Sequence, residues 1–116
     1  MKLIKTLVLM TIFTMTSAHA LVCNGEKRVT TPDGVVVQKT LLETIMQGPE
    51  LSKYALDIDE AYYSVTVHGQ DITSMITLGP DYTTGNLSKG SLDKNGNLRL
   101  SYVTPYITYI LTCSDR

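Results

Sequence analysis

Hydrophobic and polar residues alternate along most of the chain that follows residue 50. Tyr54, Leu56 and Ile58 lie at every second position, and a turn at 59–61 separates them from a similar run at 63–67. The same pattern returns in three later segments, whose predicted inward residues are Ile72, Ser74, Ile76 and Leu78; Leu98, Leu100 and Tyr102; and Ile107, Tyr109, Leu111 and Cys113. A period of two is typical of strands with one buried face, so these segments are predicted to be β-strands.

The segment 31–48 has two interpretations. Pro-Asp-Gly at 32–34 is typical of a hairpin turn between strands at 26–31 and 35–42. Alternatively, Thr31 caps a helix whose first residue is Pro32, with apolar residues at 37, 41 and 45 on one face and Gly48 ending it. The β-branched run 35–37 opposes a helix start. We expect a strand from Val35 followed by one short helix over 40–47.

Two further elements are predicted from local signals. The segment 22–30 is expected to be a first strand at a sheet edge, because it carries Glu26, Lys27 and Arg28. Asn95-Gly96 lies between segments 88–93 and 98–103, and Asn-Gly favours the type I′ turn of a β-hairpin. The chain is therefore predicted to be mainly β. We expect a single small antiparallel meander domain, forming a small barrel or a sandwich.

The first twenty residues have the order of a secretory signal peptide. Lys2 and Lys5 precede an uncharged run over 6–16, and Ala18-His19-Ala20 places small residues at a cleavage site. The apolar run is shorter than the roughly 20 residues that span a bilayer, so no stable membrane span is expected after cleavage. The prediction is a signal peptide over 1–20, typical of bacterial export, and one domain over 21–116 that is periplasmic or secreted.

Cleavage changes the charge and leaves both cysteines in place. Residues 21–116 hold eight basic and eleven acidic residues, a net charge of −3, which argues against a nucleic-acid partner. Cys23 and Cys113 lie near the two ends of this domain and have no Cys-x-x-Cys spacing. In an exported protein two such cysteines are expected to form a structural disulfide, so the two ends of the domain should be linked.

No catalytic, cofactor or metal site is expected from the residues. His68 is the one histidine of the exported domain and is expected to lie in a surface turn, without a Gly-x-Ser-x-Gly motif elsewhere. The loop starting at Asp93 has the wrong residues at the sixth and twelfth positions of an EF-hand. Asp57, Asp59 and Glu60 are interpreted as a solvated acidic turn.

Tyrosine is the sole aromatic residue type of the exported domain. Three of its seven tyrosines fall off the predicted inward faces, and we expect a partner-binding surface at Tyr62, Tyr82 and Tyr106. The expected function is that of a small, exported, non-enzymatic protein. It would bind a protein partner in the cell envelope, as an inhibitor or immunity-type protein does. The alternative is a small β-barrel that holds an apolar small ligand.

Overall fold

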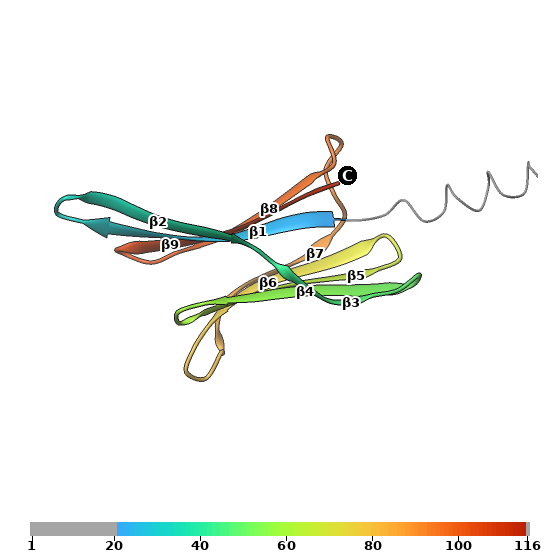
Figure 1. Cartoon of the computed structure of the whole chain (residues 1–116), viewed down its shortest axis with the longest axis horizontal. Coiled ribbons are helices and arrows are strands. Elements are labelled where there is room, and N and C mark those ends of the chain that lie inside the picture. Colours follow the sequence, from blue (N-terminus) through green and yellow to red (C-terminus); the bar gives the residue numbers. More distant parts are fainter. Residues whose placement is uncertain (1–20, 116) are drawn as a thin grey trace, which may run out of the picture.

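The domain is a sandwich of two antiparallel sheets (Figure 1). The structure, a computed structural model, describes residues 21–115; the predicted signal peptide lies outside this range and stays a prediction. The strands are β1 Leu21–Thr31, β2 Gly34–Leu41, β3 Glu43–Gln47, β4 Leu51–Ile58, β5 Ala61–His68, β6 Asp71–Leu78, β7 Thr84–Gly90, β8 Asn97–Val103 and β9 Ile107–Asp115.

The two sheets divide the chain in different ways. The four-stranded sheet has the order β2-β1-β9-β8 and so combines the first two and the last two strands of the domain. The five-stranded sheet has the order β3-β4-β5-β6-β7, a meander of consecutive hairpins. The predicted antiparallel β domain is confirmed, and of its two predicted forms the structure has the sandwich. No membrane-spanning helix occurs within residues 21–115.

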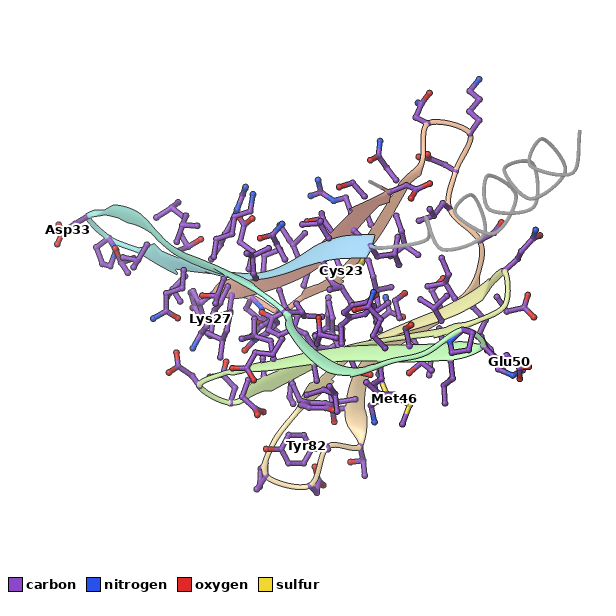
Figure 2. The ribbon with its side chains drawn as sticks, turned by 45° about the vertical axis from the view of Figure 1, so that its right-hand side comes forward. Cys23, Lys27, Asp33, Met46, Glu50 and Tyr82 are labelled. Carbon is purple, nitrogen blue, oxygen red and sulfur yellow. A yellow bond between two sulfur atoms is a disulfide. The ribbon has the colours of Figure 1, made fainter. Side chains whose placement is uncertain are left out.

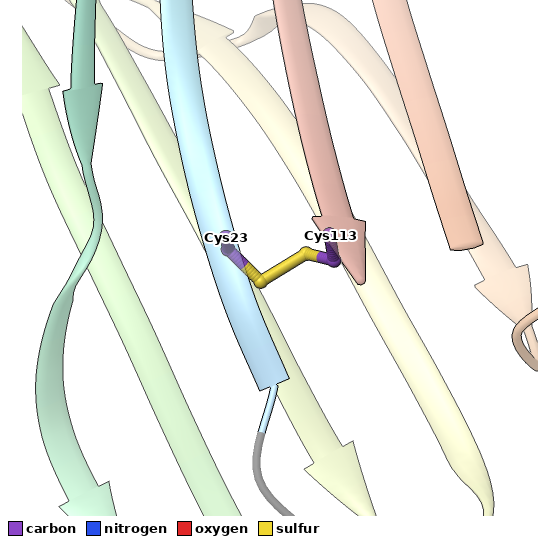
Figure 3. Close-up of a disulfide and its surroundings, with 2 residues drawn as sticks. All are labelled: Cys23 and Cys113. Carbon is purple, nitrogen blue, oxygen red and sulfur yellow. A yellow bond between two sulfur atoms is a disulfide. The ribbon is translucent and has the colours of Figure 1, made fainter. Parts of the chain in front are cut away.

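The predicted disulfide joins the first and last strands (Figure 3). Cys23 and Cys113 are register partners in β1 and β9, with Cα atoms 4.0 Å apart. Thr30 donates its backbone N–H to Tyr106 O on the β9 side, so the even residues of β1 make the hydrogen bonds to β9. Cys23 is odd and belongs to the close, non-hydrogen-bonded pairs, which suits a bond across neighbouring strands.

The core lies between the inner faces of the sheets. Tyr63 of β5 is fully buried, and its hydroxyl donates a hydrogen bond of 2.7 Å to Glu26 O of β1 in the other sheet. The ring of Tyr63 lies over Gly25, where a Cβ would come within 3.1 Å of it and within 2.8 Å of Leu56 Cδ2. A glycine is therefore needed at this point for the two sheets to pack as closely as they do.

The helix predicted over 40–47 is wrong. This region belongs to β2 and β3, which pair with β1 and β4 respectively. The residues at helical spacing, Val37, Leu41 and Ile45, are each more than half exposed, so the spacing does not mark a buried stripe. The buried residue is Leu42, whose N–H donates to Cys23 O at 2.9 Å where the chain crosses between the sheets.

The expectation that the first strand is an edge is also wrong. β1 lies between β2 and β9 in the four-stranded sheet. Its charged residues are tolerated there because they have partners. Lys27 binds two carboxylates of the opposite sheet, and Arg28 donates a hydrogen bond to Glu26. The charged residues of β1 therefore indicate ion pairing and not a position at the sheet edge.

The hairpin predicted around Asn95-Gly96 is wrong as well. β7 pairs with β6 and β8 pairs with β9, so the turn connects strands of different sheets. Gly96 has a positive φ of 79°, but Asn95 does not share it, and a type I′ turn needs both. Asp93 organises the turn instead, because its Oδ1 accepts the N–H groups of Asn95 and Asn97, each at 2.9 Å.

Candidate functional site

The most apolar part of the domain surface is one sheet edge. We call residues 34–47 the edge segment; it comprises β2, Leu42 and β3, and forms the free edge of each sheet in turn. Every residue of β2 and β3 is exposed. Of the eleven large hydrophobic residues exposed among 21–115, six lie here: Val35, Val36, Val37, Leu41, Ile45 and Met46. Figure 2 shows Asp33 at the hairpin tip just before this segment begins, and Met46 near the other end of the segment.

The other sheet edges carry protective features that β2 lacks. The side-chain amide of Asn86 in β7 donates to Ser101 O in β8 at 2.9 Å, which ties the two opposite edges together. A bulge between Thr44 and Met46 interrupts the pairing of β3 with β4. Charges, bulges and bridging contacts of this kind prevent strand pairing between molecules. β2 has a regular ladder to β1 and a single charge, Lys39.

The backbone groups of β2 alternate between its two sides. Leu42 donates its N–H to Cys23 O of β1, so the even residues of β2 point their backbone groups toward β1. The odd residues Val35, Val37, Lys39 and Leu41 therefore point their N–H and C=O groups away from the sheet. These groups form a row of free donors and acceptors between exposed valines, which is the arrangement that accepts an added strand.

A charged cluster joins the two sheets beside the middle of β2, because Lys27 of β1 is the register partner of Gln38. Lys27 Nζ of β1 lies 3.0 Å from Asp59 Oδ2 and 2.8 Å from Glu60 Oε1, both in the turn between β4 and β5 (Lys27 is labelled in Figure 2). Tyr109 of β9 donates its hydroxyl to the other carboxylate oxygen of Glu60. The cluster thus joins two strands of the four-stranded sheet to the β4–β5 turn of the five-stranded sheet.

The cluster shifts the pKa values of its members. Burial alone would lower the pKa of Lys27, but hydrogen bonds to Glu60 and Asp59 outweigh it and the pKa is raised above 10.5. Burial alone would raise the pKa of Glu60, but hydrogen bonds from Lys27 and Tyr109 outweigh it and the pKa is lowered below 4.5. Burial, followed by the hydrogen bond to Glu60, raises the pKa of Tyr109. Both charges are stabilised, so the cluster is suited to holding the sheets together.

Sequence reasoning found the acidic turn but missed its partner. Asp59 and Glu60 bind Lys27, whereas Asp57 has no ion pair among the described residues. A signal was available in the alternation of β1. Cys23, Gly25 and Lys27 occupy the same face, so a lysine at an inward position indicated an acidic partner on the opposite sheet.

The three tyrosines of the predicted binding surface lie in two places. Tyr62 of β5 and Tyr82, in the loop after β6, pack edge to face with ring centroids 6.4 Å apart. Tyr106 lies in the turn between β8 and β9 of the other sheet and is 72% exposed. The structure brings Tyr62 and Tyr82 together and leaves Tyr106 on a separate part of the surface.

The remaining candidate chemistry is at the ends of the sandwich. His68 is exposed at the end of β5 opposite Asp71, and no hydrogen bond within 21–115 joins it to a serine or a carboxylate. At the same end, an open cleft of about 480 Å³ lies between the sheets. Its apolar lining is formed by Leu21, Pro49, Leu51, Tyr54, Val67, Ile72 and Leu92. No group of three metal-ligating side chains occurs in the part of the chain that the structure describes.

Comparison with known proteins gives no further guidance, because no known protein family, curated protein or solved structure matches this chain. Within residues 21–115, the disulfide is a feature that indicates a location. Such bonds persist in oxidising, extracellular-type compartments and are rare where thiols are kept reduced.

Proposed function

We propose that the domain is an exported, non-enzymatic binding protein that takes a protein partner along the edge segment. The observation that carries this proposal is the concentration of exposed apolar side chains on a strand whose outer backbone groups are free. An added strand satisfies those backbone groups and covers the side chains at the same time. An exposed apolar edge without such a role is a hazard for aggregation.

The proposed location is the periplasm or the space outside the cell. The disulfide supports an oxidising compartment, and the order of residues 1–20 supports export. In that setting a domain of this size acts as an inhibitor or immunity-type protein does, by covering part of another protein. The aromatic pair Tyr62–Tyr82 is a second contact surface for the same partner.

The test is capture of the partner by the disulfide-bonded domain from envelope or culture extract, with two matched variants. Val37→Lys places a charge on the edge segment, and Val103→Lys places the same charge on an exposed valine of β8. We expect Val37→Lys to abolish capture and Val103→Lys to retain it. Amide exchange at Val35, Val37 and Lys39 should slow in the complex, because these N–H groups become hydrogen-bonded.

Two outcomes would contradict the proposal. A protein captured equally well by both variants would bind elsewhere on the domain. Failure to enrich any protein above a bead control, in extracts of cells that express the chain, would remove the protein-binding function altogether.

A second candidate function is the binding of an apolar small ligand, which the cleft of about 480 Å³ favours. This volume lies within the usual range for small-molecule sites. The ligand would occupy the end of the sandwich, because the middle is filled by residues such as Tyr63, Ile76 and Leu111. Binding of an apolar fluorescent probe should be lost in Ile72→Glu and kept in the surface variant Leu87→Glu. Equal probe binding by both variants would end this candidate.

A further inference from the structure

We propose that the partner of β2 is a second copy of the same chain. The two β2 strands would pair antiparallel about a two-fold axis at Val36, so that Asp33 of each copy lies opposite Lys39 of the other. This inference rests on the proposed function of the edge segment and names one of its partners. It leaves β3 and the Tyr62–Tyr82 pair free for the partner protein proposed above.

The sequence around Val36 is self-complementary in charge. Residues 33–39 read Asp-Gly-Val-Val-Val-Gln-Lys, with an acid three residues before Val36 and a base three residues after it. Antiparallel pairing about Val36 brings each acid opposite a base. Opposite charges that face each other across a strand pair stabilise it. Neither Asp33 nor Lys39 has an ion pair with another residue of 21–115, so both charges are available.

The backbone permits this register. Pairing about Val36 sets Val35 of one copy opposite Val37 of the other, and both residues belong to the odd positions with free N–H and C=O groups. Each such pair exchanges two hydrogen bonds, and the two-fold axis produces two of these pairs. Val36 faces its own copy in a close, non-hydrogen-bonded pair. The result is a continuous eight-stranded sheet made of two four-stranded ones.

The side chains also fit this arrangement. Val35 and Val37 lie on one face of β2, so the axis gathers four valines from the two copies on that face. Each of these valines is more than half exposed in the single chain. Figure 1 shows the tip of the β1–β2 hairpin reaching beyond the five-stranded sheet.

Other registers fit less well. A shift of two residues, with the axis at Val37, places Asp33 opposite Leu41 and Lys39 opposite Val35, so both charges lose their partners. A shift to Gln38 places Lys39 opposite Val37 and moves Asp33 beyond the paired strands. If the two-fold axis lay between two residues, odd positions of one copy would face even positions of the other. The free backbone groups of one copy would then face groups that are already bonded to β1.

Single cysteines test the register directly. In the disulfide-bonded protein, Val36→Cys should form a covalent dimer under mild oxidation, because the two residues face each other on the axis. Val37→Cys and Gln38→Cys are matched controls on the same strand and should remain uncrosslinked. Peptide mapping checks that Cys23–Cys113 stays intact. Crosslinking through position 37 or 38 and not 36 would overturn the proposed register.

Charge reversal provides an independent test by sedimentation equilibrium. Asp33→Lys and Lys39→Asp should each weaken the dimer by about tenfold, because two like-charge pairs replace two opposite pairs. An equimolar mixture of the two variants should form a mixed dimer with the affinity of the original chain. Lys39 also faces Glu26 of β1, so melting curves verify that each variant is folded. A mixture as weak as its components would overturn the proposal.

Different experimental outcomes would exclude the dimer and the proposed binding of a partner protein. If the chain stays monomeric at all accessible concentrations while Val37→Lys still abolishes capture from extract, the second copy is excluded and the heterologous partner stands. If the chain dimerises in the proposed register while extract yields nothing, the edge segment serves self-association alone and the proposed partner protein is excluded.

Discussion

Removal of the Cys23–Cys113 bond should lower the stability of the domain substantially without changing its strand pairing. Two versions of this perturbation are available. The bond can be reduced in the unchanged protein, or both residues can be replaced in the double variant Cys23→Ala/Cys113→Ala. The strand register that surrounds the bond runs from Leu21 and Asp115 to Val29 and Ile107 and does not depend on sulfur. The same fold is therefore expected in both cases.

The expected magnitude follows from the length of chain that the bond closes. The two cysteines are 90 residues apart in sequence, for which the chain-entropy model predicts at most about 4.6 kcal/mol. Measured values for disulfides are typically about 2–4 kcal/mol. In a domain of roughly 100 residues this corresponds to a decrease in Tm of about 10–25 °C. A disulfide that closed a shorter loop would contribute less to the stability.

The assay is denaturant and thermal unfolding followed by far-ultraviolet circular dichroism. Comparison of the reduced protein with the double variant separates the loss of the crosslink from the loss of two buried sulfur atoms. The slope of the unfolding free energy against denaturant should increase without the bond, because the uncrosslinked unfolded chain exposes more surface. A reduced protein that melts within about 2 °C of the oxidised protein would refute the entropic reasoning.

Three further predictions follow from the packing and the charged cluster. The free energy of unfolding should fall as the pH drops below 4.5. The pKa of Glu60 in the folded protein lies below this usual value, so the stabilisation that its carboxylate provides is lost as the carboxylate is protonated. Because the pKa of Lys27 is raised, its contribution to the free energy of unfolding stays constant up to pH 10.5. The variant Glu60→Gln should lose less stability at acidic pH than the original chain, which unfolding measured across the pH range checks. Gly25→Ala should destabilise the domain by about 1–3 kcal/mol in urea unfolding, because the new Cβ lies 3.1 Å from the Tyr63 ring. An unchanged midpoint would mean that the two sheets can move apart at Gly25 without a loss of stability. Ser74→Ala should stabilise the domain by about 1 kcal/mol, because the Ser74 hydroxyl is fully buried and has no hydrogen-bond partner among residues 21–115. A loss of stability would show that the hydroxyl has a partner.

The period of two was sufficient to predict the inner faces of the later strands. Tyr63, Val65 and Leu111 were expected to point inward and are fully buried. The alternation is a reliable signal there because each of these strands has one face on the core and one toward solvent. The pairing of the cysteines followed from the expected compartment, and the register of β1 with β9 bears it out.

The signal failed where a strand has no buried face. β2 and β3 are exposed on both sides, so no core imposed a period on their apolar residues. The spacing of Val37, Leu41 and Ile45 fitted a helix by coincidence. The turn at 95–96 failed for another reason. Asn-Gly favours tight turns between paired strands, but Asp93 supplies side-chain hydrogen bonds that stabilise a different turn.

The residue types of the candidate site could be predicted from the sequence, whereas its position on the fold could not. Exposed tyrosines were a reasonable guess for a partner surface, and Tyr62 and Tyr82 do lie together. The three consecutive valines at 35–37 were visible in the sequence and were assigned to a strand, but nothing in the pattern indicated that this strand is an exposed edge. Only the sheet order reveals that β2 is an unpaired edge, because that order depends on contacts between residues far apart in the chain.

The position of the disulfide also determines how the domain responds to mechanical force. Leu21 and Asp115 are register partners, so a pulling force applied through them acts directly on the Cys23–Cys113 bond two residues further in. The covalent bond carries that load, and the strands enclosed between the cysteines are shielded from it. After reduction the same force would separate β1 from β9 one hydrogen bond at a time, from the ends inward. The redox state of a single bond therefore decides whether tension on the chain can unfold the domain.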